Sequence, residues 1–268
     1  MSPDRPVVFF HIPKTAGSTT SVVFEKLFAG QPQYLAGRNG LSHFDDCVRF
    51  LELSGQTRRV FAYITGHLEM QIVAAVPGEP FVFTFLRDPL SRLVSLYQYV
   101  KRTPTHHMHQ WIEQRQASVL DFIRECPWDE VYNGMTRRLA GIHSARMNDK
   151  RTLALALNNV DAHFSFVGIQ EYFDECLFYL GHLLNIGMED LVYQKKNANP
   201  NPHVPVAIDQ ATKDMAERIN AMDFELYEFY LKKLKEKLSR SFPEPYFKEF
   251  EAFKKAVQLQ ALATADNG

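Results

Sequence analysis

Three short stretches of the sequence carry side chains that suit anion binding and proton transfer. The stretch HIPKTAGSTT at 11–20 holds Lys14, one glycine and several hydroxyl side chains. His67 follows a Thr-Gly pair, and Arg87 and Ser95 lie in FLRDPLSRLVSLY. Lysine, arginine and hydroxyl groups bind phosphate oxygens, and histidine exchanges a proton near neutral pH. Together these residues indicate chemistry on a ligand that carries phosphate.

Each of these stretches follows a short apolar run that is typical of a buried strand. The runs cover 7–12, 60–64 and 81–86, and FSFVG at 164–168 is a fourth. Continuous apolar strands that alternate with helices are typical of a parallel sheet covered on both faces. Ligands of such sheets bind at the carboxyl ends of the strands. We therefore expect an α/β fold with an open parallel sheet, and all three stretches at one edge of it.

The loop after the first strand reaches a helix within a few residues. The first N–H groups of a helix have no partner within it, so they converge on one spot and attract an anion. The residues expected to bind a phosphate here are Lys14, Thr15, Ala16, Gly17, Ser18, Thr19 and Thr20. The pattern GxxxxGK[ST] of nucleoside triphosphatases is absent, and we find no convincing acidic partner for Mg²⁺. A capped turn with a solvated lysine is the alternative.

The third stretch predicts a strand that ends at Arg87 and a helix that Asp88 caps and Pro89 opens. Ser95 lies two turns into that helix. An arginine fork beside a serine hydroxyl suits a terminal phosphate monoester. The alternative is an Arg–Asp pair at a helix start, with Arg92 exposed.

His67 follows the second of the three strands and would open onto the same edge as Lys14 and Arg87. At that edge it could take the proton of an attacking hydroxyl group. A lone histidine is more often structural, so its neighbours carry this interpretation. Glu69 and His43 are further candidates, either to assist His67 or to contact the acceptor.

The middle of the chain holds weaker signals. His106, His107 and His109 form a dense group without a clear carboxylate partner. We expect a solvated or acceptor-contacting segment there and no metal site. Arg137 or Arg138 could meet an acidic sugar, although a helix with a solvated basic face is the simpler interpretation.

Composition excludes several classes of protein. The chain has 268 residues and a formal net charge of -1, so we expect neither a nucleic-acid partner nor an acidic membrane surface. Its 3 cysteines form no CxxC pair, which favours a reducing compartment. No apolar stretch approaches the roughly 18 residues of a membrane span, and no signal peptide precedes the first strand. These features predict a soluble cytoplasmic protein, and they carry no signal for an oligomeric state.

We find no internal repeat and no linker in the sequence. One domain is therefore expected over residues 1–268, with a core at about 7–240 and a C-terminal helix at about 245–261.

Five motifs occur in an order that resembles a known enzyme family. They are HIPKTAGST, TGH, TFLRDPLSRLVSLY, FVGIQEYFDECL and KKNANP, within roughly residues 7–235. Together they resemble the glycan 2-O-sulfotransferase-like enzymes, in the compact soluble form found in bacteria. The resemblance implies a P-loop-kinase-like α/β fold with helical insertions. It also implies use of 3′-phosphoadenosine 5′-phosphosulfate (PAPS) without a metal.

The resemblance assigns roles to individual residues. Lys14 takes the place of the lysine that contacts the 5′-phosphate and the leaving oxygen. Arg87 and Ser95 match the pair that grips the 3′-phosphate, and His67 falls where the 2-O-sulfating members carry their base. The late loop that closes over the nucleotide is matched by KKN, which includes Lys196 and Asn197.

The leading hypothesis is therefore a sulfotransferase that moves a sulfuryl group from PAPS to an acceptor hydroxyl. We expect that hydroxyl to lie on a saccharide or a glycosylated metabolite. A small-molecule kinase that uses ATP and Mg²⁺ and a non-catalytic nucleotide-binding protein are the alternatives.

Overall fold

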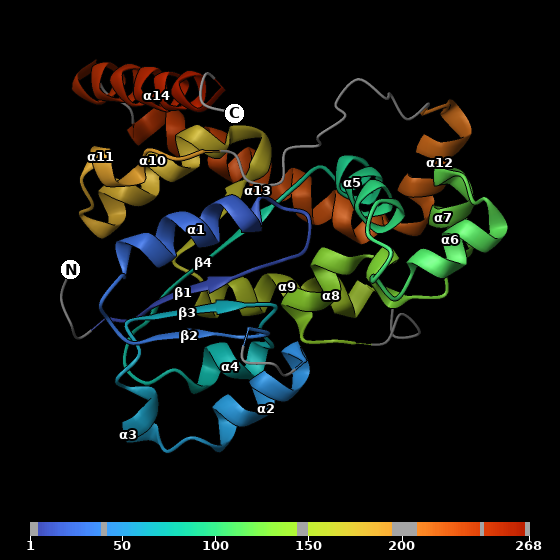
Figure 1. Cartoon of the computed structure of the whole chain (residues 1–268), viewed down its shortest axis with the longest axis horizontal. Coiled ribbons are helices and arrows are strands. Elements are labelled where there is room, and N and C mark those ends of the chain that lie inside the picture. Colours follow the sequence, from blue (N-terminus) through green and yellow to red (C-terminus); the bar gives the residue numbers. More distant parts are fainter. Residues whose placement is uncertain (1–4, 39–41, 144–149, 195–207, 242–243, 266–268) are drawn as a thin grey trace.

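The computed structural model of the chain describes residues 5–38, 42–143, 150–194, 208–241 and 244–265. Its centre is a parallel sheet of five strands in the order β2-β3-β1-β4-β5 (Figure 1). The strands are β1 (Val7–Phe10), β2 (Gln33–Leu35), β3 (Tyr63–Gly66), β4 (Phe81–Leu86) and β5 (Phe166–Ile169). The predicted α/β class with an open parallel sheet is confirmed.

The four strands expected from the sequence are present, with β4 at the predicted bounds. The strand expected at 60–64 begins three residues later, as β3, and ends at Gly66. The sequence did not predict β2, because only one of its three residues is buried. Such a short edge strand lacks the apolar run that marks the others.

The helices of the described chain cover both faces of the sheet and extend beyond its carboxyl edge. They are α1 (Gly17–Leu27), α2 (His43–Glu52), α3 (Gly55–Arg58), α4 (Met70–Ala75), α5 (Pro89–Lys101), α6 (His109–Arg115), α7 (Val119–Glu125), α8 (Gly134–Ala140), α9 (Lys150–His163), α10 (Phe173–Leu184), α11 (Met188–Leu191), α12 (Gln210–Ile219), α13 (Ala221–Ser241) and α14 (Glu244–Ala265). Figure 1 shows α5, α6, α7 and α12 grouped beyond the strand ends, and α14 beside α10 on the other side of the molecule. None of the described helices is long and apolar enough to cross a bilayer.

The apolar core has two clusters, one at the sheet and one among the helices beyond its carboxyl edge. The larger one holds the sheet and the helices on its faces, with Phe9 stacked on Phe83 at 4.9 Å between ring centres. The smaller one lies among α5, α6, α7 and α12 and includes Leu96 and Phe122. The helix expected at 245–261 is the middle of α14, which docks through Phe253 on the larger cluster.

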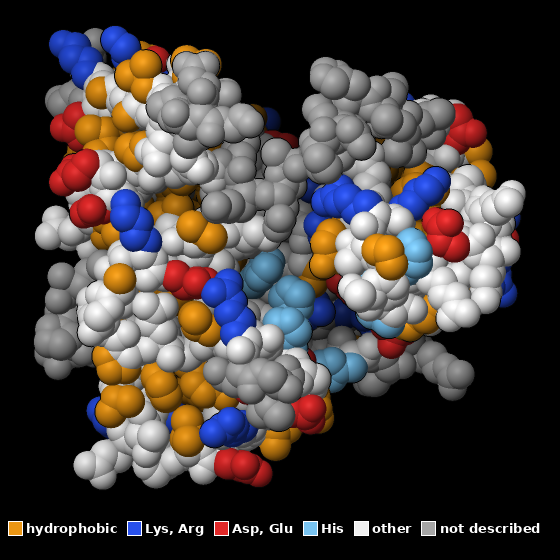
Figure 2. All heavy atoms as spheres, in the orientation of Figure 1, with side chains coloured by type: hydrophobic (Ala, Val, Ile, Leu, Met, Phe, Trp, Pro, Cys, Tyr) orange, Lys and Arg blue, Asp and Glu red, His pale blue; other side chains and the backbone are white. Residues whose placement is uncertain are grey.

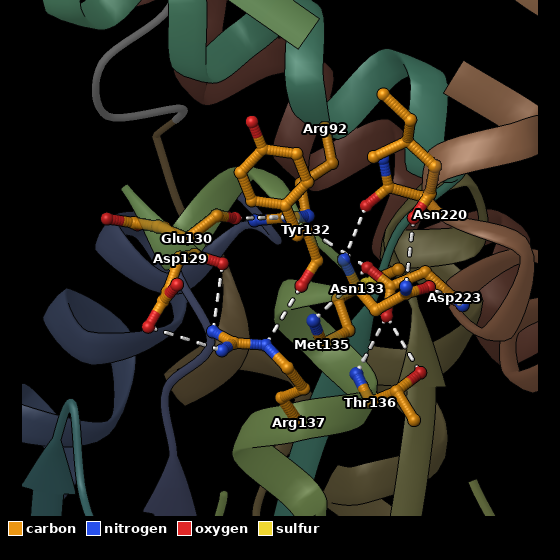
Figure 3. A network of polar contacts seen from close by, with 11 residues as sticks. Arg92, Asp129, Glu130, Tyr132, Asn133, Met135, Thr136, Arg137, Asn220 and Asp223 are labelled. Atoms are coloured by element: carbon orange, nitrogen blue, oxygen red, sulfur yellow. Dashed lines mark hydrogen bonds and ion pairs between the residues drawn. The ribbon is translucent and has the colours of Figure 1, made fainter. Parts of the chain in front are cut away.

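A buried polar network fixes the helices of the smaller cluster to α8 and α13 (Figure 3). The carboxylate of Asp223 accepts hydrogen bonds of 2.7–3.2 Å from the N–H groups of Met135 and Thr136 and from the Thr136 hydroxyl. Arg92 Nη2 lies 3.9 Å from Asp223 Oδ2, and both side chains are 1% exposed. The same Nη2 donates to the Glu130 carbonyl at 3.0 Å. Arg92 is therefore buried, and the alternative that placed it in solvent is wrong.

Two asparagines complete the network. The side chain of Asn133 accepts from the Asp223 N–H at 3.0 Å and donates to the Ile219 carbonyl at 2.9 Å. Asn220 Oδ1 accepts from the Asn133 N–H at 2.6 Å. The α5 helix, the start of α8 and the α12–α13 junction therefore hold one another in place.

Replacing Asp223 with alanine should destabilise the protein strongly, because it leaves the buried Arg92 guanidinium without a counter-charge. We expect the free energy of unfolding in urea to fall by about 3–5 kcal/mol. Glu225→Ala, on the exposed side of the same helix, is the matched control and should change it by less than about 0.5 kcal/mol. Equal losses in the two variants would contradict this role of the network.

Candidate active site

The loop between β1 and α1 has an unusual backbone. Lys14 and Ala16 have φ values of 69° and 70°, in the left-handed region that non-glycine residues rarely adopt. Such conformations cost about 1–3 kcal/mol each and cluster at functional sites. Left-handed residues in a turn direct successive N–H groups to one side and form a concave site for an anion.

Two threonines hold this loop in shape. Thr15 is fully buried, and its hydroxyl donates to the Ile12 carbonyl at 2.8 Å. The hydroxyl and the N–H of Thr20 both donate to the Ala16 carbonyl, at 3.1 and 3.2 Å. These two side chains therefore stabilise the loop and do not line the cavity that it borders.

A cavity of about 880 Å³ opens where β1 and β4 end. The predicted phosphate-binding residues on its wall are Lys14, Ala16, Gly17, Ser18, Thr19, Arg87 and Ser95. The sheet thus brings together the first and third stretches of the sequence analysis. Lys196 and Asn197 lie outside the described residues.

Cations dominate one end of the cavity. The Lys14 ammonium lies 4.1 Å from the centre of the Tyr99 ring. Burial, with added repulsion from Arg102 and Arg87, lowers the pKa of Lys14 to about 8. Arg87 Nη1 donates to the Lys14 carbonyl at 3.2 Å, and its buried Nε has no hydrogen-bond partner in the described part of the chain. An unpaired donor on a buried guanidinium suits a bound phosphate.

Three histidines, the histidine row, lie side by side at the neighbouring strand ends. The rings of His11 and His67 are 4.8 Å apart in an edge-to-face contact, and those of His67 and His43 are 4.3 Å apart and stacked. Figure 2 shows histidine side chains gathered in the hollow of this face, with Lys and Arg side chains nearby. His11 lines the cavity, and His67 lies one ring further from it.

The sequence motifs predict a role for His67 and none for His11. The signal was present, because His11 follows β1 as His67 follows β3, and Phe10 pairs with Gly66 in the sheet. The order of the strands, which the sequence did not give, is what makes the two histidines neighbours. Of the two possible helpers of His67, His43 contacts it, whereas Glu69 lies 3.1 Å from His143 Nε2.

Burial lowers the pKa values of all three histidines of the row, which favours their neutral forms. Burial lowers the pKa of His11 to about 3, and the positive charge of Arg138 adds to the effect. The pKa of His67 lies well below its usual value for the same main reason. A neutral imidazole can accept a proton, which is what a general base must do.

The histidines at 106–109, a weaker signal of the sequence, contact one another and the backbone. His106 stacks on His107 at 4.5 Å, and His109 Nδ1 lies 2.9 Å from the Val100 carbonyl. Within the described ranges, no three His, Cys, Asp or Glu side chains are placed to hold a metal ion.

Arg137 does not face an acceptor. It is 5% exposed and donates to the carbonyl groups of Tyr132, His143 and Asp129 at 2.7–2.9 Å. Both expectations for Arg137, a contact with an acidic sugar and a place on a solvated basic face, are wrong, because the side chain is buried and its donors are bonded to the backbone.

The parallel sheet and the left-handed loop at its first strand-to-helix turn define an α/β protein of the P-loop-kinase-like class. The family model of the galactose-3-O-sulfotransferases matches residues 1–267, and the chain belongs to that family. The sequence motifs resemble glycan 2-O-sulfotransferase-like enzymes, and the matched family is named for 3-O-sulfation of galactose. The predicted class, a glycan sulfotransferase, is confirmed.

Curated relatives agree with this family. Human galactose-3-O-sulfotransferase 3 is 26% identical over 255 residues, which cover 85% of this chain and 57% of the relative. Galactosylceramide sulfotransferase of Bos taurus is 25% identical over 282 residues, which cover 99% of this chain and 65% of the relative. The chain thus spans about three fifths of the length of these relatives.

Acid should destabilise the folded protein through His11. An unfolded histidine titrates near pH 6.5 and folded His11 near 3, so between these values the unfolded state binds more protons. The stabilisation is present above pH 6.5 and falls by up to about 1.4 kcal/mol per pH unit below it. Urea unfolding between pH 7 and 5 measures this slope.

His11→Gln should flatten the slope, because glutamine does not titrate. His163→Gln, at an exposed position on α9, is the control and should leave the slope as in the wild type. Identical slopes in His11→Gln and the wild type would contradict the assignment.

Proposed function

We propose that the chain transfers a sulfuryl group from PAPS to a hydroxyl group of a galactose-bearing saccharide or glycolipid. The observation that carries this proposal is one cavity lined by two groups of residues of types that bind phosphate, Lys14 with the α1 N-terminus and Arg87 with Ser95. PAPS has two phosphate sites, at its 3′ and 5′ positions. The family and the names of the relatives support the sulfuryl chemistry and galactose as the acceptor sugar. The cytoplasmic location stays a prediction from the sequence.

The residues of the cavity fit the donor. A volume of about 880 Å³ lies within the usual range for sites that bind molecules of this size. The 5′-phosphosulfate would lie at the β1–α1 loop, where N–H groups and the helix dipole favour negative charge. The 3′-phosphate would accept from Arg87, whose Nε lacks a partner in the described chain, and from the Ser95 hydroxyl.

The part of the wall next to Arg87, where Glu171 accepts from the Asp88 N–H at 3.1 Å, differs in character and suits the nucleoside. It carries the carboxylates of Glu171 and Asp174, which accept hydrogen bonds from Tyr227 and Tyr193. Carboxylates repel phosphate and accept hydrogen bonds from hydroxyl and amino groups. We therefore assign this wall to the ribose and the base.

In the proposed reaction, Lys14 would act on the leaving phosphate and the histidine row on the acceptor hydroxyl. The new bond forms between the acceptor oxygen and sulfur as the bond between sulfur and the 5′-phosphate oxygen breaks. The Lys14 ammonium and the loop N–H groups stabilise the charge on the departing phosphate. His67 takes the proton of the acceptor hydroxyl. The His67 ring contacts His11, which itself lines the donor cavity. The phosphosulfate is already activated, so the transfer needs no metal.

Two variants should separate the steps when ³⁵S-labelled PAPS is offered with lactose or galactosylceramide. His67→Ala should lower kcat at least 100-fold, because the proton has no acceptor, while adenosine 3′,5′-bisphosphate still binds. Arg87→Ala should instead weaken binding of that nucleotide about 10-fold or more, through loss of a charge-assisted fork.

His163→Ala is the control for both variants and should behave as the wild type. Near-normal turnover by His67→Ala would show that another group is the base. A wild-type protein that labels neither acceptor and binds no bisphosphate would contradict the proposed function as a whole.

A further inference from the structure

Tyr99 lies on α5 and contacts two cations that both line the cavity. The Lys14 ammonium lies 4.1 Å and the Arg102 guanidinium carbon 5.7 Å from the centre of the Tyr99 ring. Both distances fall within the roughly 6 Å range of a cation–π contact. The ring therefore gathers two positive charges at one place on the cavity wall.

Arg102 directly follows the last residue of α5. A cation at a helix C-terminus is common, because it faces the negative end of the helix dipole. Two features distinguish Arg102 from such a residue: it lines the cavity, and it shares its aromatic ring with Lys14. Its guanidinium makes no hydrogen bond or ion pair with a residue that the structure describes, so its donors are available to a ligand.

The charges of Lys14 and Arg102 repel each other. Burial lowers the pKa of Lys14 most, and the repulsion from Arg102 lowers it more than the repulsion from Arg87 does, in agreement with the shared ring. Two like charges held on one wall favour a bound anion, because the anion offsets their repulsion.

The face of α5 that borders the cavity runs between two arginines. Its residues on the wall are spaced three or four apart, as neighbours on one side of a helix are, and they are Ser91, Ser95, Gln98 and Arg102. Arg87 lies before the helix and bonds to the Lys14 carbonyl. The Lys14 ammonium lies about three turns further along, at Tyr99, and Arg102 follows. In PAPS the 3′-phosphate, the 5′-phosphate and the sulfuryl group follow one another in the same order.

We propose that Arg102 binds the oxygens of the sulfuryl group and that the Tyr99 ring positions Arg102 and Lys14 for this ligand. This assignment rests on the proposed function. There, Arg87 holds the 3′-phosphate and Lys14 serves the leaving oxygen of the 5′-phosphate, which leaves the peripheral sulfuryl oxygens without a cation. A planar guanidinium binds two such oxygens in a fork. Lys213 of α12 lines the same cavity, but among the described residues only Lys14 and Arg102 contact the Tyr99 ring through their charges.

The test of Arg102 compares PAPS with adenosine 3′,5′-bisphosphate, which lacks only the sulfuryl group, by calorimetric titration without acceptor. Arg102→Gln should bind PAPS about 10-fold or more weakly than the wild type does, through loss of a charge-assisted fork. It should bind the bisphosphate within about 2-fold of the wild type, because that ligand lacks the group in the fork, which also shows that the variant is folded. Arg115→Gln is the matched control and should change neither affinity, because Arg115 also lies over an aromatic ring, that of Trp111 at 5.1 Å, but does not line the cavity.

Two variants of Tyr99 test the ring. Tyr99→Leu removes the ring and should weaken binding of PAPS about 5-fold, and that of the bisphosphate less, because both cations lose their position. Tyr99→Phe keeps the ring and should bind PAPS as the wild type does. Equal losses in the two variants would assign the effect to the Tyr99 hydroxyl and overturn the positioning role.

Three outcomes would overturn the assignment of Arg102. An equal loss for both ligands would mean that Arg102 supports the nucleotide site in general. Unchanged affinity of Arg102→Gln for PAPS would show that Arg102 does not reach the sulfuryl group, and a loss in Lys213→Gln would then assign that group to Lys213. A wild-type protein that binds neither nucleotide would remove the proposed function and this inference together.

Discussion

The strained turn at Lys14 and Ala16 is the constraint on which the site depends. Two hydrogen bonds offset the cost of the two left-handed residues: a buried one from Thr15 to the Ile12 carbonyl and a partly buried one from Arg87 to the Lys14 carbonyl. The second bond matters most for function, because it ties the β1–α1 loop to the end of β4. The two groups of residues proposed to bind phosphate are therefore parts of one arrangement. A change in the loop would move the arginine as well.

The β1–α1 loop and the start of α1 also pack closely against the histidine row. A Cβ atom at Gly17 would overlap the His11 ring, so the first turn of α1 and the histidine row fit against each other. His11 also donates its backbone N–H to the Gly66 carbonyl at 3.2 Å, directly before His67. The buried pair of Arg92 and Asp223 also holds elements of the site in place, at a greater distance from the cavity. It fixes α5, which carries Ser95, relative to α8.

Local signals in the sequence were enough to predict several of these elements. The six residues of β4, five of them apolar, and the cap of α5, where Asp88 accepts from the Ser91 N–H at 2.7 Å, are set by neighbours in the chain. The burial of Arg92 was not predictable, because its partner Asp223 lies far along the sequence. The histidine row depends on β3 lying beside β1, which strand order alone decides. Motif resemblance supplied the class of reaction, which no periodicity or composition could have given.

The central claim is that one cavity binds two phosphate groups of a single nucleotide. Calorimetric titration with adenosine 3′,5′-bisphosphate and with adenosine 5′-monophosphate, each in the presence of EDTA, tests it most directly. The account predicts one bisphosphate per chain, bound at least 10-fold more tightly than the monophosphate because Arg87 and Ser95 hold the 3′-phosphate. Equal affinities would remove the second phosphate subsite. Binding of ATP only in the presence of Mg²⁺, with no binding of the bisphosphate, would contradict the account and favour a kinase.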